Sequence, residues 1–253
     1  MQRVAALYDV HGNVPALEAV LERVADLDVD LIVVGGDVLP GPQPKEALAA
    51  LAALTTPTLF IGGNGERDVV AAHRGADLAS LPEQARAVVR WTADALSEDE
   101  LRAIASWPDV VEVAIEGVGD VLFCHATPRS DRELFTERTA VERLLPAFED
   151  VDAQVVVCGH THVQFDRQVG PARVVNAGSV GMPFGEPGAY WLLLGPDVEF
   201  RRTGYDFDAA ARRIAECSYP AAGGFARDNV LRPPSAEAMV AAFEEAASRT
   251  SGP

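Results

Sequence analysis

Residues 8–13, Tyr-Asp-Val-His-Gly-Asn, combine two side chains that can bind a metal with a glycine turn. The apolar residues Val4 to Leu7 lead into Asp9 and His11, and Gly12 follows at once. In open α/β sheets, ligands bind at the carboxyl ends of the strands. The pattern therefore predicts a strand that ends at a ligand site. Asp-x-His is common by chance, so the prediction depends on the strand ends that follow.

Four further strand-like runs end in residues that can bind a cation. These residues are Asp37, Asn64, His125 and the pair His160 and His162. Each motif taken singly is more often a strand cap, a turn residue or a polar hairpin corner. Five motifs in the same position favour a shared site. Seven oxygen and nitrogen ligands without a thiolate are too many for one tetrahedral zinc, and they suit two divalent cations, Mn²⁺ first, then Fe, Zn²⁺ or Ni²⁺.

Two divalent cations about 3.5–4 Å apart form a clamp for in-line displacement at phosphorus. One carboxylate must bridge the two ions, and a water shared between them would lose a proton and become the nucleophile. The residue types therefore predict hydrolysis of a phosphate ester.

The first third of the chain alternates strands with helices. Val14–Ala25 has apolar residues at helical spacing, Asp30–Asp37 is an aliphatic run that ends in Gly-Gly-Asp, and Thr58–Ile61 predicts a third strand. With a helix from Pro44 to about Leu54, this order predicts a parallel βαβαβ unit.

A helical stretch follows, with helices predicted at 82–96 and 98–106 and a capping box at Ser97–Glu100. We interpret residues 69–107 as a helical insertion or lid over the metal edge that shapes substrate choice. His73 lies in it, and we expect a surface histidine rather than a ligand.

Strands return in the second half and end in a helical tail. The predicted strands are 110–115, 120–124, 154–158, 163–168, 172–176, 190–194 and 198–203, with a helix near 139–148. The tail, residues 205–253, has helices predicted near 207–217 and 236–248, around a Gly/Pro-rich stretch at 220–234. The sequence leaves three roles open for it: packing on the domain, covering a sheet edge, or forming a homodimer contact.

Composition limits the partners. The 253 residues suit one domain, 1–253, and carry a net charge of −17, which disfavours binding to bulk nucleic acid. No apolar run approaches the length of a membrane span, and the chain starts directly in a strand, so we expect a cytoplasmic protein. Three cysteines do not suggest a disulfide framework.

Taken together, the motifs Asp9-x-His11, Gly36-Asp37, Gly63-Asn64, His125 and Gly159-His160-Thr-His162 resemble those of the calcineurin-like metallophosphoesterase superfamily. The resemblance covers most of residues 1–203. It is closest to the compact bacterial and archaeal phosphodiesterase branch, as residues 91–97 and 176–181 indicate. It implies an α/β (α+β) fold of four layers, in which two mixed β-sheets lie between helices.

The resemblance also implies roles for the ligands. Asp9, His11 and His162 would hold one metal, and Asn64, His125 and His160 the other, with Asp37 bridging them. Asp37, Asn64 and His125 would be the catalytic residues. Asn13 and Ser179 have no ligand role in the common pattern, so we expect them to support the ligands.

One position departs from the family pattern. Many members carry a histidine after the Gly-Asn motif, where it helps the leaving group depart, whereas this chain has Gly65. We therefore expect a preference for good leaving groups, with Glu66 as a substitute acid or Arg67 as a substitute positive charge. A positive φ at Gly65 would make a histidine there strained. Arg67 and Arg129 are candidate substrate-binding residues, and a surface salt bridge is an equally good interpretation of each.

The leading hypothesis is an enzyme that hydrolyses a small phosphate ester, most of all a phosphodiester. The alternatives are a protein Ser/Thr phosphatase or a dinucleoside polyphosphate hydrolase of the same fold. A scaffold without metal chemistry, like a retromer subunit that resembles this branch, is the alternative of a different class. The full ligand set argues against it.

Overall fold

The computed structural model describes residues 1–250 and places ten strands in two mixed sheets. The first sheet has the order β10-β9-β1-β2-β3, formed by β1 (Val4–Leu7), β2 (Leu31–Val34), β3 (Thr58–Phe60), β9 (Ala189–Leu194) and β10 (Val198–Thr203). The second has the order β4-β5-β6-β8-β7, formed by β4 (Val110–Ile115), β5 (Gly119–Cys124), β6 (Val155–Cys158), β7 (Phe165–Val169) and β8 (Ala172–Asn176).

The predicted parallel unit is confirmed, because β1 pairs with β2 and β2 with β3 in parallel. Strand β9 then adds to β1 in the antiparallel sense. Residues of β1 alternate between two cores: Val4 and Ala6 pack between the sheets, whereas Ala5 and Leu7 pack toward the helices. Successive side chains of a strand point to opposite faces, so the first sheet is buried on both sides.

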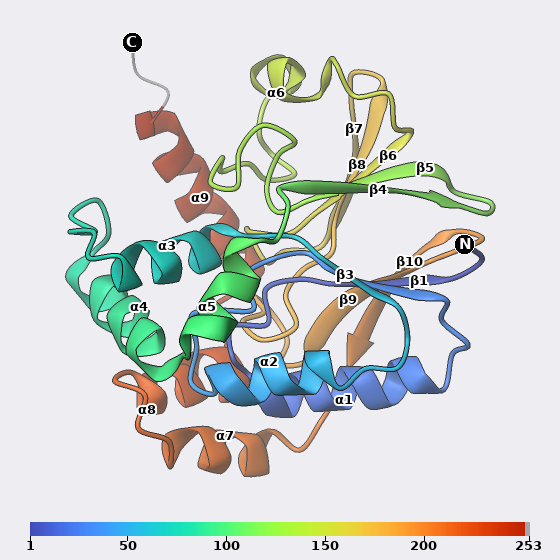
Figure 1. Ribbon diagram of the computed structural model, residues 1–253. Coiled ribbons are helices and arrows are strands. Elements are labelled where there is room, and N and C mark those ends of the chain that lie inside the picture. Colours follow the sequence, from blue (N-terminus) through green and yellow to red (C-terminus); the bar gives the residue numbers. More distant parts are fainter. Residues whose placement is uncertain (251–253) are drawn as a thin grey trace.

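Helices cover the outer faces and complete the four predicted layers (Figure 1). Helices α1 (Val14–Ala25) and α2 (Pro44–Ala52) lie on the first sheet, and α6 (Val141–Phe148) lies on the second. Asn13 caps α1 by accepting from the amide of Ala16. This cap fixes the helix start directly after the first ligand motif.

The predicted insertion, residues 69–107, begins within α3 (Asn64–His73) and contains α4 (Glu83–Ala95) and α5 (Glu98–Ala105). The capping box of Ser97 and Glu100 begins α5 as predicted. Apolar residues of all three helices join the core of the first sheet, so the segment is built into the fold. His73 is exposed and pairs with Glu98, as expected of a surface histidine.

The tail packs on the domain and is more helical than predicted. Beyond α7 (Phe207–Ala215) and α9 (Ala236–Thr250), the Gly/Pro-rich stretch forms the short helix α8 (Ala222–Phe225) and a π-helix at Ala226–Leu231. Helices α7 and α8 and the π-helix share an apolar cluster with Val88 and Trp91 of α4. Burial of Phe225 and Val230 there outweighs the weak helix propensity of the two preceding glycines.

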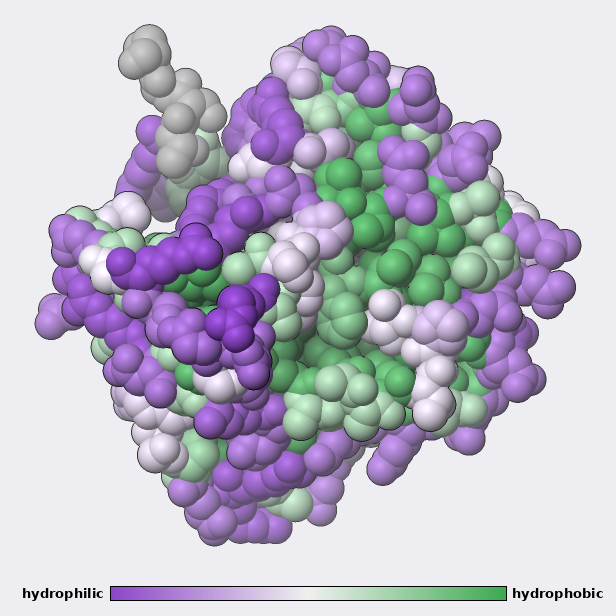
Figure 2. Space-filling model, in the orientation of Figure 1, coloured by the Kyte–Doolittle hydropathy of each residue, from purple (hydrophilic) through white to green (hydrophobic). Residues whose placement is uncertain are grey.

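Hydrophilic and hydrophobic residues cover different parts of the surface. Figure 2 shows hydrophilic residues over the outlying helices and a hydrophobic area around the edge strands β3 and β4. Leu59 and Val110 on these strands are exposed. Within residues 1–250, no helix has the length and apolar character needed to span a bilayer.

Candidate metal centre

The loops that carry the candidate ligands turn sharply after each strand. Five ligand residues have the positive φ of the left-handed region: Asp9 (54°), His11 (45°), Asp37 (50°), His160 (66°) and His162 (58°). Side chains other than glycine rarely adopt this conformation, and such residues cluster at functional sites. The tight turns bring ligands from different strand ends together.

A first cluster consists of Asp9, His11 and His162, all buried. Oδ1 of Asp9 lies 3.3 Å from Nε2 of His162 and 4.0 Å from Nε2 of His11, and the two imidazole nitrogens are 3.3 Å apart. Oδ2 of Asp9 accepts from the amide of His160, whereas the buried Oδ1 has no hydrogen-bond partner among the described residues. An unsatisfied buried carboxylate oxygen is costly, and a cation would satisfy it.

A second cluster consists of Asp37, His125 and His160. Asn64 joins it, because one terminal atom of its amide lies 3.0 Å from Nδ1 of His160 and 3.2 Å from Nε2 of His125. An amide oxygen at that position would be a ligand for a cation held by the same two nitrogens. All seven residues predicted as ligands are therefore near one another.

Backbone carbonyls orient three of the imidazoles. Nδ1 of His11 faces the carbonyl of Pro40 at 3.3 Å, Nδ1 of His125 that of Gly35 at 3.0 Å, and Nδ1 of His162 that of Met182 at 2.8 Å. Such a contact places the proton on Nδ1 and leaves Nε2 as the ligand atom. The orientation and proton position of these three rings fit metal ligation.

Asp37 lies between the two clusters. Its Oδ1 is 3.5 Å from Nε2 of His125, and its Oδ2 is 3.8 Å from Nε2 of His11. The amide of Gly65 also donates to Oδ1 at 2.7 Å. Each carboxylate oxygen therefore faces a different cluster.

Burial and mutual attraction separate the pKa values of neighbouring groups. Burial alone would lower the pKa of His125, but the carboxylates of Asp37 and then Asp9 raise it to about 10. Burial and repulsion by His125 lower the pKa of His160 to about 4. Although burial raises the pKa of Asp37, attraction by His125 and His11 holds it well below its ordinary value. The site keeps its carboxylates ionised, as ligation requires.

Glu66 connects the loop of Asp37 to the loop that carries Gly63 and Asn64, a role that the sequence did not predict. Its Oε2 accepts from the amides of Asp37 and Gly63, and its Oε1 from that of Leu39, each at 2.9 Å. Burial, followed by repulsion from Asp37, raises the pKa of Glu66 to about 7. A carboxylate at the third position of a helix does signal a cap, but the contacts across to the other loop have no local sequence signal.

Gly65 lies in the first turn of α3, against the neighbouring loop. A Cβ at this position would be 2.0 Å from the carbonyl oxygen of Leu39, so no larger side chain fits without a backbone shift. Gly65 is not in the left-handed region, which corrects the expectation that a positive φ would oppose a histidine there. The obstacle is lack of space.

The predicted substrate-binding arginines lie beside the second cluster. Arg67 and Arg129 both line a pocket of about 150 Å³ together with the ligand His125. Arg67 pairs with Asp109 and Asp131, and Arg129 pairs with Glu133. The geometry thus combines the two interpretations of the sequence, since each arginine is in a salt bridge and next to the ligands. Contact of either arginine with a substrate stays a prediction.

Two supporting groups lie around the first cluster. Oγ of Ser179 donates to the carbonyl oxygen of Asp9 at 2.7 Å, and the side-chain amide nitrogen of Asn13 donates to the carbonyl oxygen of Gly181 at 2.9 Å. The ring of Phe184 stacks on His162, with centroids 5.3 Å apart and an interplanar angle of 20°. Asn13 and Ser179 support this loop region as expected, whereas the sequence did not point to Phe184.

The chain belongs to the calcineurin-like phosphoesterase superfamily, whose domain it matches over residues 2–195. An uncharacterised protein of Methanocaldococcus jannaschii is 25% identical over an alignment of 240 residues, and the match covers 86% of this chain and 93% of that protein. A metallophosphoesterase from Sphaerobacter thermophilus has a similar structure, with a TM-score of 0.67, 25% identity, and coverage of 90% of this chain and 99% of that one.

A hypothetical protein from Pyrococcus horikoshii shares the fold with a TM-score of 0.79 at 19% identity, over 93% of this chain and 100% of that chain. The family and fold inferred from the motifs are therefore confirmed.

Proposed function

We propose that the protein is a phosphodiesterase that uses two divalent metal ions to hydrolyse a small phosphodiester. The observation that carries this proposal is the pair of ligand clusters, with one oxygen of Asp37 facing each. The superfamily supplies the coarser frame of a phosphoesterase.

The residues fit metal ions because buried carboxylate and imidazole atoms converge, and within residues 1–250 the buried Oδ1 of Asp9 has no hydrogen-bond partner. Asp9, His11 and His162 would hold one ion, Asn64, His125 and His160 the other, and Asp37 would bridge them. Bound ions would neutralise charge on the phosphate and activate a water at neutral pH. The mixed carboxylate and imidazole donors suit Mn²⁺, with Fe, Zn²⁺ or Ni²⁺ as further candidates.

The protein's own groups would orient the substrate. Asn64 and His125 stand at the side of the second cluster that adjoins the pocket with Arg67 and Arg129. In this arrangement the two arginines face the phosphate and its ester arms, and the amide of Asn64 helps to fix the phosphate.

The charge balance of the pocket favours a diester over a monoester. Arg67 is paired with two carboxylates, and Arg129 with one. Arg132, which lies 3.5 Å from the carbonyl of Asn64, is paired with Asp68. A monoester dianion would therefore meet compensated cations, whereas a diester carries a single charge.

Residue 65 would supply no imidazole to protonate the leaving group. A general acid contributes roughly 10²–10⁴-fold to the rate. Without one, esters whose leaving alkoxide is weakly basic should react fastest. Since Glu66 is held by three backbone amides, it is a poor substitute as the acid.

The setting that we propose is the cytoplasm, with a small molecule as the substrate and no binding of bulk nucleic acid. Cys124, Cys158 and Cys217 are free thiols, as is usual in a reducing compartment. The net charge of −17 disfavours polyanions.

The test is the variant Asp37→Asn. We expect it to lose metal and the hydrolysis of bis(p-nitrophenyl) phosphate together while its circular dichroism spectrum is unchanged. Asp28→Asn is the matched control, since Asp28 also has a positive φ (47°) but belongs to neither ligand cluster. Two equivalents of bound metal in Asp37→Asn would refute the bridging role. Absence of metal and activity in the native protein would favour the scaffold instead.

A further inference from the structure

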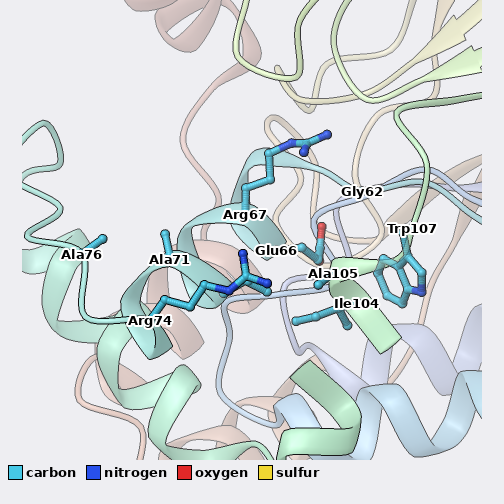
Figure 3. Close-up of a pocket in the computed structure, with 10 residues that line it drawn as sticks. Gly62, Glu66, Arg67, Ala71, Arg74, Ala76, Ile104, Ala105 and Trp107 are labelled. Atoms are coloured by element: carbon cyan, nitrogen blue, oxygen red, sulfur yellow. The ribbon is translucent and has the colours of Figure 1, made fainter. Parts of the chain in front are cut away.

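A second and larger pocket lies beside the metal centre, between α3 and the end of α5 (Figure 3). Its volume is about 450 Å³, within the range of small-molecule sites. The walls combine cations, an aromatic ring and small apolar side chains. They include Arg67, Val70, Ala71, Arg74, Ile104 and Trp107.

The two sides of the pocket differ in chemistry. Helix α3 contributes Arg67, and Arg74 follows at its end, two helical turns further and so on the same face. The opposite side is formed by Ile104, Ala105 and Trp107. The indole of Trp107 stacks on Phe60, with centroids 4.9 Å apart and an interplanar angle of 18°. This stacking holds an aromatic wall in place opposite the arginines.

Arg74 supplies the charge that is free for a ligand. Within residues 1–249, no carboxylate lies within 4.0 Å of its guanidinium, whereas Arg67 pairs with Asp109 and Asp131. In Figure 3, Arg74 extends across the pocket toward Ala105. Arg74 is exposed and lines the pocket, so its guanidinium is available to pair with an anion that enters there.

The pocket adjoins the catalytic edge. Gly62 and Glu66 line it, and they flank the ligand Asn64 in the sequence. Arg67 lines both this pocket and the smaller one that contains His125. The side chain of Arg67 therefore forms the boundary between the metal side and the Trp107 side.

We propose that this pocket binds a ring-bearing anion of the nucleoside monophosphate type. Its phosphate would pair with Arg74, and its ring would lie among Trp107, Ile104 and Ala105. The same chemistry has two sources, the far half of a diester substrate or a separate nucleotide. The pocket itself does not depend on the proposed function, whereas its assignment to the substrate does.

The first experiment measures binding of AMP to the metal-loaded protein by calorimetry. We expect Arg74→Ala, which loses the cation, and Ala71→Glu, which places an acid in the pocket, to weaken binding about tenfold or more. Arg212→Ala is the control, because Arg212 is an exposed arginine of α7 outside the pocket. Equal affinity in the native protein and both pocket variants, or no saturable binding at millimolar AMP, would overturn the proposal.

The second experiment distinguishes the two sources. It compares bis(p-nitrophenyl) phosphate with a dinucleotide that carries a 5′-phosphate. If the pocket binds the far half of the substrate, Arg74→Ala raises the KM of the dinucleotide about tenfold and leaves that of the aryl diester unchanged. If AMP binding is weakened but both KM values are unchanged, the ligand is a separate nucleotide. If the native protein hydrolyses neither diester, the proposed function fails, and the binding data alone decide on the pocket.

Discussion

At the scale of single residues, Glu66 connects loops that β2 and β3 position independently. Its carboxylate accepts hydrogen bonds from three backbone amides, two in the loop of Asp37 and one at Gly63, just before Asn64. The distance between Asp37, the proposed bridging ligand, and Asn64, a proposed terminal ligand, therefore depends on a residue outside the proposed ligand set. Residues of this kind are needed because ligands must be held within about half an ångström to act together.

We predict that Glu66→Gln weakens both folding and metal binding. A glutamine has one oxygen, so its NH₂ group would face an amide donor, and an unsatisfied buried donor costs about 1–3 kcal/mol. Urea unfolding of the metal-free protein and calorimetric titration with Mn²⁺ measure the two effects. Glu100→Gln is the control, since Glu100 is the corresponding capping residue of α5. Equal losses in the two variants would contradict a special role for Glu66.

His125 gives a second prediction, on pH. Its raised pKa of about 10 means that the metal-free imidazole is protonated at neutral pH, and a ligand must be neutral. Binding of the ion at this cluster should therefore release a proton at neutral pH, and its affinity should rise with pH up to about 10. Calorimetry in buffers of different ionisation enthalpy counts the protons. Metal binding without proton release would show that His125 is neutral beforehand.

At the scale of elements, α9 reaches the metal centre through aromatic contacts. Phe243 of this helix packs on Phe184, with ring centroids 6.0 Å apart, and Phe184 stacks on the ligand His162. Glu244 fixes the other side of the helix by accepting from Thr136 and Thr139. The C-terminal tail, for which the sequence left three roles open, thus supports a ligand from a distant strand end.

We predict that Phe184→Ala lowers the affinity of the cluster of Asp9, His11 and His162 about three- to tenfold. Aromatic pairs are worth about 0.5–1.5 kcal/mol, which here would be lost from the orientation of His162. Competition with a chelating dye measures the affinity. The control is Phe200→Ala on β10, where the phenylalanine is 42% exposed. If both variants bind metal equally well, the stack does not orient the ligand.

The elements themselves were largely predictable because short aliphatic runs and glycine turns mark strand ends. Strands β2 and β6 were recognisable without any alternation of polar and apolar residues, since they are continuous apolar runs buried on both faces. The pairing of β9 with β1 was not predictable, because it joins opposite ends of the sequence, such as Val4 and Leu194. The grouping of the seven proposed ligands was predictable from their place after strands, whereas Glu66 and Phe184 act through contacts that only the folded chain creates.

At the scale of the whole molecule, we expect folding and metal binding to be separable. Three apolar clusters fill the layers between and outside the sheets, and the proposed ligands lie at loops beyond the strand ends. The cores should therefore stabilise the fold without the ions, unlike small domains that unfold when metal is removed.

We predict that a chelator removes the ions and leaves the folded structure intact. Each site contributes about 2.7 kcal/mol when the free ion is at about 100 times its Kd, and about 1 kcal/mol shifts the Tm of a domain of this size by about 2–4 °C. Loss of both ions should therefore lower the Tm by about 10–20 °C, while the circular dichroism spectrum at room temperature is unchanged. Cooperative unfolding at room temperature on chelation would contradict this independence of the cores.

The left-handed backbone of five ligand residues has a consequence for evolution. Glycine adopts this conformation without a steric penalty, whereas other residues pay about 1 kcal/mol or more at each position. A descendant that no longer needed its ions would gain stability by mutation of Asp9, His11, Asp37, His160 or His162 to glycine. The five side chains therefore hold a strained backbone that the proposed metal binding would explain.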